Sequence, residues 1–484
     1  MDKLNTTIKN ILSSISDEIL SGQKVYLVGG ALRDIFLKRV PLDFDFAVNK
    51  NVLKLSKKIA KKFNGKLVVL DDVNRIYRVV VQLENQHYTF DFSSMKGKNI
   101  FEDLSNRDFT INAFAIELPL KDLSKNSIID PFSGIKDMKS KNIKMVSDRA
   151  FIDDPLRLFR AYRFSAELNF NIEEKTRKYI RKYAHLILNS AKERINYELK
   201  KIFSTDDSYS IVLEMDKQGL MEYVFPEIKI MKKSSKKFYF HPEGLWQHSK
   251  LSLYRFEKIL SSPGKFFPEK DLREKIIKHI WPRIPLLKII TLFHDIAKPE
   301  SVKKIKGRTR FFGHEKLGAE KIKDLLKRLR FSSKDIQVAE KIVQNHMRPG
   351  NLCSAKILTD KAIYRFFNDL GDVSIDLLLV SQADRMSYIG ISAKHKDITQ
   401  FNNFVQKLSK KFFEYKKKLE QPKLVDGYLI MEKFGLEQGP LIGKILNIVH
   451  ENQSIGRIST TEEALKLIEK ILPKFLKKTD RIKN

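Results

Sequence analysis

The sequence predicts an α+β fold, in which a mixed sheet with helices occupies the first third of the chain and helices make up almost all of the rest. Short stretches rich in β-branched and aromatic residues follow one another as far as Ile116, which is typical of strands. From about Ala150 onwards, apolar residues recur at helical spacing. The 484 residues, 42% apolar and 31% charged, suit a soluble protein of two to four domains.

The first third contains one expected helix followed by six expected strands. Met1–Leu20 predicts an amphipathic helix, because its isoleucines and leucines recur at helical spacing. The expected strands are KVYLVGG (24–30), DFDFAV (43–48), KLVVL (66–70), RIYRVVVQL (75–83), HYTFDF (87–92) and FTINAFAI (109–116).

The charge balance favours a polyanionic partner. Lys and Arg number 91 against 59 Asp and Glu, which gives a net charge of +32 and would attract nucleic acid from a distance. A Lys-rich, solvated surface is an alternative explanation. Cys353 is the only cysteine, which excludes an intramolecular disulfide and a thiolate zinc cluster and favours a reducing compartment. No apolar run has the length of a signal-peptide core or a membrane span, so we expect a cytoplasmic protein without a membrane partner.

Two glycines at the end of the first strand suggest a phosphate site. Gly29 and Gly30 allow the backbone to approach a phosphate, and the helix that follows would direct its first N–H groups and Arg33 at the same anion. Such a pair of glycines is common in α/β folds and has little specificity alone.

Two aspartates in the second strand suggest a metal site. Alternate residues of a strand share a face, so Asp43 and Asp45 would project together while Phe44 and Phe46 enter the core. Two neighbouring carboxylates are suitable ligands for Mg²⁺, which assists phosphoryl transfer. A solvent-facing acidic pair on an edge strand is the alternative.

Six segments, taken in order, resemble the class II tRNA nucleotidyltransferase and bacterial poly(A) polymerase family. They are VGGALRD (28–34), LDFDFAV (42–48), NRDFTINA (106–113), DPFSGIKDMKSKNIKMV (130–146), DDPLRLFRAYRF (153–164) and KERI (192–195). The family has a polymerase-β-type nucleotidyltransferase head. Asn106 departs from its pattern, which usually has a basic residue there.

The resemblance implies a role for each matching residue. Asp43 and Asp45 would be catalytic and would ligate Mg²⁺, and Asp91 is a candidate third carboxylate, with a structural role as the alternative. Asp154 and Arg157 would read the base in place of a nucleic-acid template. The remaining nucleotide-binding candidates are Gly29, Gly30 and Arg33 for the triphosphate, Arg107, Asp108 and Asn112 for the ribose, and Arg160 and Arg163 for phosphate, unless these last two form only a charged helix surface.

A histidine-rich middle segment resembles the HD superfamily of metal-dependent phosphohydrolases. Six of the ten histidines lie between His241 and His346. The pattern predicts a divalent transition-metal site (Mn, Ni, Fe or Zn) with the ligands His248, His294, Asp295 and Asp384. His314 and His346 would support this site or bind a second metal. A helical RNA-binding scaffold with packed histidines is the alternative.

Together the resemblances imply four domains and a function. We expect a nucleotidyltransferase head (1–148), a neck and body that bind RNA and nucleotide (149–235), an HD phosphohydrolase-like domain (236–392) and a helical tail (393–484). The expected activity is addition of CCA, or part of it, to tRNA 3′ ends from CTP and ATP, with a possible HD phosphohydrolase activity. The partners would be tRNA or another RNA 3′ end, and no protein partner is visible.

The nucleotides that are added remain open. The short connection SSMKGKNIFE (93–102) weakens an assignment to full CCA addition, because CC-adding relatives are marked by a shortened loop and A-adding relatives can also be compact there. Poly(A) polymerase, CC-only and A-only addition are alternatives. A further alternative is an HD phosphohydrolase whose head only binds RNA.

Overall fold

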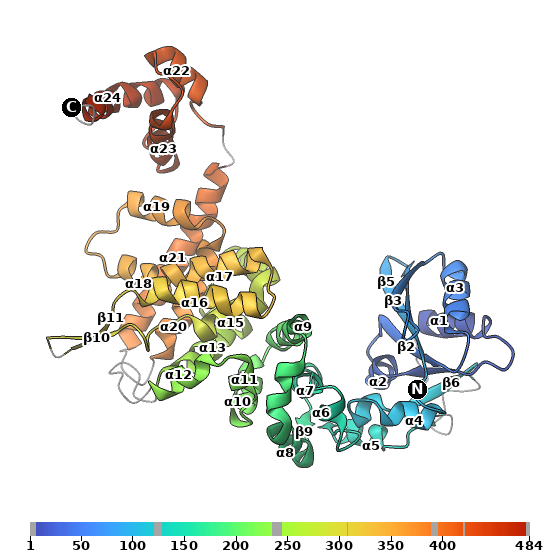
Figure 1. The fold of residues 1–484 in the computed structure, drawn as a ribbon. Helices are drawn as coiled ribbons and strands as arrows, with labels where there is room; N and C mark the ends of the chain where they lie inside the picture. Colours follow the sequence, from blue (N-terminus) through green and yellow to red (C-terminus); the bar gives the residue numbers. More distant parts are fainter. Residues whose placement is uncertain are drawn as a thin grey trace. The chain divides into compact units, whose positions relative to one another are not determined.

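The computed structural model describes residues 6–120, 128–234, 244–306, 308–388, 395–419 and 422–480. The chain forms two compact units, Met1–Pro226 and Glu227–Asn484 (Figure 1). The predicted α+β fold is confirmed, since a mixed sheet lies in the first unit and helices dominate the second. The expected domain boundaries at 235/236 and 392/393 lie outside the described residues. No helix among the described residues is both long and apolar enough to span a membrane.

A seven-stranded sheet organises the first part of unit 1. Its strands, in spatial order, are β3 (Lys66–Asp71), β4 (Ile76–Leu83), β5 (Gln86–Ser94), β2 (Asp43–Val48), β1 (Val25–Val28), β6 (Ala115–Leu118) and β7 (Ile128–Ile129). Only β2 and β5 pair in parallel; every other neighbouring pair is antiparallel. The central β2 strand, which carries both predicted metal-binding aspartates, is thus hydrogen-bonded on both edges.

Phenylalanines from β2 and β5 form one core face of this sheet. Phe44 lies opposite Phe90 and Phe46 opposite Phe92, and all four are fully buried. The rings of Phe46 and Phe92 stack with their centroids 4.9 Å apart. Burying each ring stabilises the fold by roughly 1.5–3 kcal/mol. Since side chains alternate along a strand, this burial directs the intervening aspartates to the other face.

The stretch Phe109–Ile116, expected as one strand, is not continuous. Thr110–Asn112 is a 3₁₀ turn, and the strand β6 begins only at Ala115. Two polar side chains account for the difference, because they bond to groups outside the sheet. The Thr110 hydroxyl donates to Asp137, and the Asn112 amide donates to Asp108.

Helices cover the sheet and make up most of the rest of unit 1, which also has a small parallel pair of strands, β8 (Asn142–Ile143) and β9 (Asn171–Ile172). They are α1 (Thr6–Ser16), α2 (Gly30–Phe36), α3 (Val52–Lys62), α4 (Ile100–Ser105), α5 (Gly134–Lys139), α6 (Ala150–Asp153), α7 (Arg157–Leu168), α8 (Glu174–Tyr183), α9 (Lys192–Phe203), α10 (Ser208–Lys217) and α11 (Leu220–Val224). The expected N-terminal amphipathic helix is present but ends at Ser16, with Ile8, Ile11, Leu12 and Ile15 buried. Helix α3 packs against β3, β4 and β5 (Figure 1).

Where the structure describes it, unit 2 is helical apart from one hairpin, β10 (Val302–Ile305) and β11 (Arg308–Phe311), which the sequence did not predict. Its helices are α12 (Glu227–Lys233), α13 (Leu245–Ser261), α14 (Lys270–Ile280), α15 (Ile284–Phe293), α16 (His314–Arg328), α17 (Ser333–Asn345), α18 (Arg348–Cys353), α19 (Asp360–Leu370), α20 (Val373–Ser387), α21 (His395–Leu419), α22 (Gly427–Phe434), α23 (Pro440–Ser454) and α24 (Thr461–Asp480). Helices α13, α15, α17 and α20 pack together, and α22–α24 share a separate apolar cluster.

Candidate functional site

Three carboxylates lie side by side on the polar face of β2 and β5. Asp43 and Asp45 alternate with the buried Phe44 and Phe46, as the strand period requires. The parallel register sets Asp91 directly opposite Asp45. Arg78 donates two hydrogen bonds to the Asp91 carboxylate, at 2.8 and 2.7 Å. Asp91 is therefore neutralised within the chain, whereas Asp43 and Asp45 have no comparable cationic fork in the described structure.

Gly29 shapes the space around the Asp45 carboxylate. Its φ of 74° lies in the left-handed region, and a Cβ atom there would lie 3.0 Å from Asp45 Oδ2 and 3.0 Å from Arg107 Nη1. Burial raises the pKa of Asp45 to about 6; the charge of Arg107 lowers this pKa, while the charges of Asp91 and Asp43 raise it. A cation beside Asp43 and Asp45 would relieve this repulsion, so these residues fit a divalent metal.

Arg33, predicted to hold a triphosphate, is engaged within the protein. Its Nη1 donates to Asn112 Oδ1 at 2.9 Å, and its other guanidinium nitrogens bond Asp34. The guanidinium also lies 5.0 Å from the centre of the Phe164 ring. Arg33 thus joins α2 to the turn at Asn112 and to α7.

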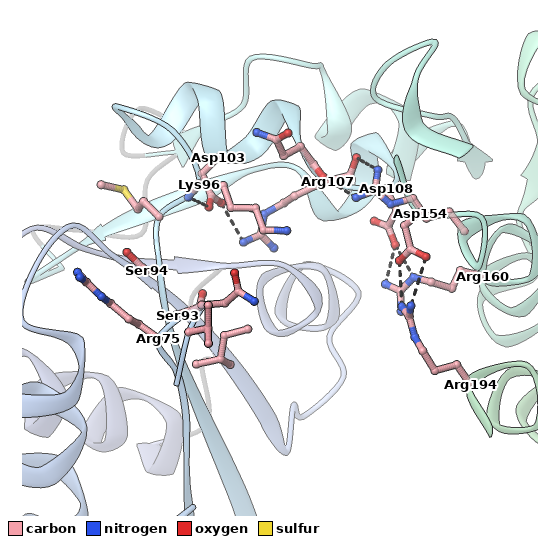
Figure 2. Close-up of a pocket in the computed structure, with 16 residues that line it drawn as sticks. Arg75, Ser93, Ser94, Lys96, Asp103, Arg107, Asp108, Asp154, Arg160 and Arg194 are labelled. Atoms are coloured by element: carbon pink, nitrogen blue, oxygen red, sulfur yellow. Dashed lines mark hydrogen bonds and ion pairs between the residues drawn. The ribbon is translucent and has the colours of Figure 1, made fainter. Parts of the chain in front are cut away.

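A pocket of about 680 Å³ opens beside these strands (Figure 2). Five of the predicted nucleotide-binding residues line it: Arg107, Asp108, Asp154, Arg157 and Arg160. Seven predicted residues are not part of its lining: Gly29, Gly30, Arg33, Asp43, Asp45, Asn112 and Arg163. Four further charged residues line the pocket without having been predicted: Arg75, Lys96, Asp103 and Arg194.

Asp108 is a permanently ionised acceptor at the pocket wall. Arg160 donates to its Oδ2 at 2.8 and 2.6 Å, while Phe109 N and Asn112 Nδ2 donate to Oδ1 at 2.8 and 3.1 Å. Burial opposes ionisation, but the charge of Arg160 and these hydrogen bonds lower the pKa of Asp108 to about 2. Asp108 therefore stays an acceptor, and never a donor, at any physiological pH.

Asp154 lies near Asp108 on the same side of the pocket and is held by Arg194 of α9 (Figure 2). Arg194 Nη2 lies 2.9 Å from Asp154 Oδ2, and the pair is visible at the right of Figure 2. Arg157 instead donates to the backbone carbonyls of Arg107, Ala150 and Asn106, at 3.3, 3.2 and 2.5 Å. Arg194 lies within the KERI segment, which matched the family pattern, but nothing in its spacing showed that it would reach Asp154.

Arg163 points away from the pocket. It bonds Glu198 at 2.7 Å and Glu167 at 3.0 Å, and its guanidinium lies 4.2 Å from the centre of the Phe164 ring. The spacing of three residues on α7 therefore places Arg157, Arg160 and Arg163 in three different environments.

A second cluster lies in unit 2, where the four predicted HD ligands meet. The candidate ligand atoms of His248 (α13), His294, Asp295 and Asp384 (α20) all lie within 4.8 Å of one another. His294 and Asp295 follow the end of α15 in a turn rather than standing on a helix. The carboxylates lie 3.2–3.4 Å from the Nε2 atoms of His248 and His294.

Asp295 also belongs to a second group with His314 and His346. The Nε2 atoms of these histidines lie 3.6 and 3.5 Å from Asp295 Oδ1 and 3.2 Å from each other. Asp295 therefore stands between two sets of imidazoles, His248 with His294 and His314 with His346.

In all four histidines Nε2 lies 3.3–3.6 Å from a carboxylate oxygen of Asp295, a position from which it can bind a metal. Nδ1 of His294, His314 and His346 lies 2.7–2.8 Å from a backbone carbonyl, which can only accept, so Nδ1 carries the proton. His248 Nδ1 lies 2.9 Å from Ser387 Oγ, whose own proton goes to the Asp384 carbonyl.

The carboxylate oxygens and the Nε2 atoms of this cluster direct lone pairs at one another, so the cluster needs a cation between them. Among the described residues, Asp295 Oδ1 and Asp384 Oδ1 are buried without a hydrogen-bond partner. Despite burial, the charges of Asp295 and Asp384 raise the pKa of His294 to about 10, so without a metal the cluster takes up a proton instead. Four imidazole nitrogens with carboxylate oxygens are a donor set that fits divalent transition metals.

A pocket of about 710 Å³ opens onto this cluster. Its cationic lining residues are Lys298, Arg310 and Arg385, and its aromatic ones are Phe311, Phe312 and Tyr388. Lys298 Nζ lies 2.5 Å from Asp295 Oδ2. The pocket thus combines metal ligands, cations for a phosphate and rings for an apolar or planar group.

Three family models match successive parts of the chain. The Poly A polymerase head domain matches residues 25–144, the probable RNA and SrmB-binding site of polymerase A matches residues 169–231, and the HD domain matches residues 272–389.

Relatives and solved structures match nearly the whole chain. An A-adding tRNA nucleotidyltransferase of Deinococcus radiodurans is 27% identical and covers 92% of this chain and 94% of its own. A CC-adding tRNA nucleotidyltransferase of Thermus thermophilus is 28% identical, over 90% of this chain and 91% of its own. The Thermotoga maritima CCA-adding enzyme complexed with tRNA has a similar fold, with a TM-score of 0.64 at 20% identity over 97% of each chain. A CCA-adding enzyme in complex with ATP has a TM-score of 0.63 at 20% identity, over 96% of this chain and 95% of that chain.

Proposed function

The chain belongs to the class II tRNA nucleotidyltransferase and poly(A) polymerase family, with an HD domain, and from this premise we propose that it extends tRNA 3′ ends with all or part of CCA, using CTP and ATP. The observation that carries the proposal is the carboxylate pair Asp43 and Asp45 beside the Gly29 turn, next to a pocket lined by Asp108, Asp154 and several arginines. We assign residues 1–148 to the head, 149–235 to the neck and body, 236–392 to the HD domain and 393–484 to the tail.

In the proposed reaction, the RNA 3′-oxygen forms a bond to the α-phosphorus of the nucleotide. The bond between the α-phosphorus and the bridging oxygen breaks, pyrophosphate leaves, and the hydroxyl proton passes to solvent. Mg²⁺ held by Asp43 and Asp45 would make the hydroxyl more acidic and neutralise the charge on pyrophosphate. Gly29 leaves room at Asp45, and Arg107, whose Nη1 lies beside this space, would bind the same phosphates.

Residues on the pocket wall would select the nucleotide. Asp108 is an acceptor for a ribose hydroxyl, because its pKa of about 2 keeps it ionised. Asp154 and Arg194 together present an acceptor beside a donor, which is the pattern of a complementary base edge. Arg157, tied to three backbone carbonyls, fixes the start of α7 and hence the position of Asp154.

Partial addition is better supported than addition of the complete CCA. The connection between β5 and α4 is only Met95–Asn99, and the two relatives described above are A-adding and CC-adding enzymes. The test is to incubate the protein with tRNAs that end before CCA, after C and after CC, each with labelled CTP or ATP. Addition of two C residues, of one A, of all three, or of an A tail gives four different ladders. No addition to any tRNA would favour the alternative in which the head only binds RNA.

A second candidate function is hydrolysis of phosphate esters at the HD cluster. The observation that favours it is the pair of imidazole sets around Asp295, each with its Nε2 atoms 3.3–3.6 Å from the Asp295 carboxylate. Mn²⁺, Ni²⁺, Fe²⁺ or Zn²⁺ bound there would supply hydroxide at neutral pH. A water oxygen would form a bond to phosphorus, and the ester oxygen would leave with a proton. Lys298 and Arg385 are placed to bind the phosphate.

The substrates we propose for this site are phosphorylated RNA 3′ ends. Release of phosphate from 3′-phosphorylated RNA, and opening of a 2′,3′-cyclic phosphate, measure it directly. Both reactions should survive Asp45→Asn and be lost in His294→Asn. If the wild-type protein loaded with each of the four metals hydrolyses neither substrate, the HD function is wrong while nucleotide addition is unaffected.

A further inference from the structure

The β10–β11 hairpin of unit 2 carries a concentrated positive charge. Residues 302–311 contain five basic side chains and no acidic one. The register sets Lys303 directly opposite Arg310, and Lys304 opposite Thr309. Like charges that face each other across a strand pair destabilise it, and here the hairpin itself has no carboxylate to offset them. A polyanion bound along the hairpin would remove this repulsion.

The hairpin runs directly into the HD pocket. Thr309, Arg310, Phe311 and Phe312 all line that pocket. His314 follows only two residues later, and its Nδ1 donates to the Phe311 carbonyl at 2.7 Å. The end of β11 is therefore hydrogen-bonded to a candidate metal ligand. A polymer bound along the hairpin would thus be led toward the metal cluster.

Phe312 adds an exposed ring to this path. Its side chain is 62% exposed, in a protein that buries most of its phenylalanines. An exposed aromatic ring beside a row of cations is the combination that binds single-stranded nucleic acid, since bases stack on the ring while phosphates meet the cations. A duplex offers no free base face for such stacking.

From these observations we propose that the β10–β11 hairpin and Phe312 bind single-stranded RNA and lead its phosphorylated 3′ end into the HD pocket. Lys303, Lys304 and Lys306 are exposed but are not part of the pocket lining. A mononucleotide in the pocket therefore does not reach them, whereas a strand that extends out of the pocket does. The site is thereby selective for polymers over free nucleotides. This inference rests on the proposed HD function, which it deepens.

The kinetic test compares substrates that differ only in length. RNA ten nucleotides long, ending in a 3′-phosphate or a 2′,3′-cyclic phosphate, is compared with the corresponding mononucleotides. In the full-length Lys303→Gln/Lys304→Gln/Lys306→Gln variant, we expect kcat/KM for RNA to fall by roughly tenfold or more, and the salt dependence of log kcat/KM to lose a slope of up to about 2. Hydrolysis of the mononucleotides should change less than about twofold, because no contact within the pocket is lost.

Matched controls separate this path from general charge. Lys278→Gln/Lys334→Gln/Lys356→Gln removes the same charge from exposed positions elsewhere in unit 2 and should leave both substrates unaffected. Phe312→Ala should weaken RNA hydrolysis, and Phe312→Tyr should restore it, because only the ring is needed for stacking. An RNA effect equal in the two lysine triples, or an equal loss for RNA and mononucleotide, overturns the proposal.

A second readout does not depend on hydrolysis. Bromouridine placed near the 3′ end of the same RNA is crosslinked by light to the full-length protein carrying His294→Asn, and the crosslinked peptides are identified by mass spectrometry. We expect a crosslink within residues 308–316, which is lost in Phe312→Ala. If no RNA is hydrolysed by the wild type but this crosslink forms, the HD function fails and the hairpin proposal stands. Absence of the crosslink within residues 308–316 overturns the hairpin proposal.

Discussion

Arg194 of α9 orients the carboxylate of Asp154, with Nη2 2.9 Å from Oδ2 and Nη1 3.4 Å from Oδ1. The two side chains are 54% and 28% exposed and both line the pocket of unit 1. An ion pair this exposed contributes about 0–1 kcal/mol to stability. Its geometry is thus of more consequence for a ligand than for folding.

Arg194→Ala should therefore impair nucleotide choice while leaving the fold intact. Without its partner, Asp154 loses a fixed orientation, and we expect discrimination between CTP or ATP and the other two nucleotides to fall by roughly 10- to 100-fold. The discrimination of Arg194→Lys should lie between those of the wild type and Arg194→Ala, since lysine keeps the charge but not the planar fork. The measurement is kcat/KM for each of the four nucleotides, with thermal unfolding as the check on folding. Unchanged selectivity would mean that this pair does not contact the base.

Asp45→Asn should separate activity from stability. Burial and the charges of Asp91 and Asp43 raise the pKa of Asp45 to about 6, so the ionised group is unfavourable where it stands. We expect nucleotide addition to fall by at least about 100-fold, as for loss of a principal electrostatic catalyst, while the melting temperature is unchanged or higher. Asp71→Asn, at a half-buried carboxylate of β3 that is not part of the pocket lining, is the matched control and should keep full activity. A fall in stability with Asp45→Asn would contradict this account.

The parts of the site that the sequence predicts are those governed by local periodicity. Alternation along Asp43–Phe46 is sufficient to separate two carboxylates from two core rings, because a strand offers only two faces. The strands of the first third, the helical second unit and the Gly29 turn follow from the same kind of local signal, whereas the mixed pairing of the strands is implied by the family resemblance. The convergence of His248, His294, Asp295 and Asp384 follows instead from a resemblance, since these residues stand on three elements up to 136 positions apart.

The parts that the sequence does not predict depend on long-range pairing. Arg160 bonds Asp108 across 52 positions, and Arg194 bonds Asp154 across 40. Spacing on α7 cannot distinguish Arg157, Arg160 and Arg163, because their environments are set by the carbonyls and carboxylates of other elements. The β10–β11 hairpin was missed because its lysines and arginines give no apolar alternation, the usual sign of a strand.

Gly29→Ala should abolish nucleotide addition through a steric effect that can be isolated. Alanine at a φ of 74° is strained, and its Cβ would lie 3.0 Å from both Asp45 Oδ2 and Arg107 Nη1. Gly219→Ala is a matched control in the same unit, with a φ of 77° and nothing within 4 Å of the new Cβ. We expect Gly219→Ala, whose ψ of 2° is left-handed helical, to lose about 1 kcal/mol of stability, and Gly29→Ala, whose ψ of −140° suits essentially only glycine, to lose roughly 1–3 kcal/mol; only Gly29→Ala should lose activity. Equal activity in the two variants would show that the space at Asp45 is not needed.

His346→Asn should remove one of two metal ions from the HD cluster. The two ligand groups share Asp295, so we expect the wild type to bind two ions and either His346→Asn or His248→Asn to bind one. Metal content is measured by plasma mass spectrometry after loading with Mn²⁺, in an Asp45→Asn background so that the head contributes no ion. His450→Asn, on α23, is the control and should retain both. A single ion in the starting protein would mean that His314 and His346 only support the first site.

Acid should selectively weaken the contribution of Asp108 to the stability of unit 1. Its folded-state pKa of about 2 lies below the ordinary value of 3.8, so its stabilisation is complete above about pH 4 and is lost as pH falls through 2. The groups that face it are Arg160, Asn112 and the Phe109 amide, and Arg160 in turn lies 3.8 Å from Glu198. Both the wild type and Asp108→Asn contain Glu198, so its pH-dependent contribution to stability cancels when the two proteins are compared. We expect the difference in unfolding free energy between them to shrink by about 2 kcal/mol from pH 5 to pH 2. Urea unfolding, with hydrogen exchange of peptides around Asn112 to report on this unit, measures it; a difference independent of pH would mean that Arg160 does not hold an ionised Asp108.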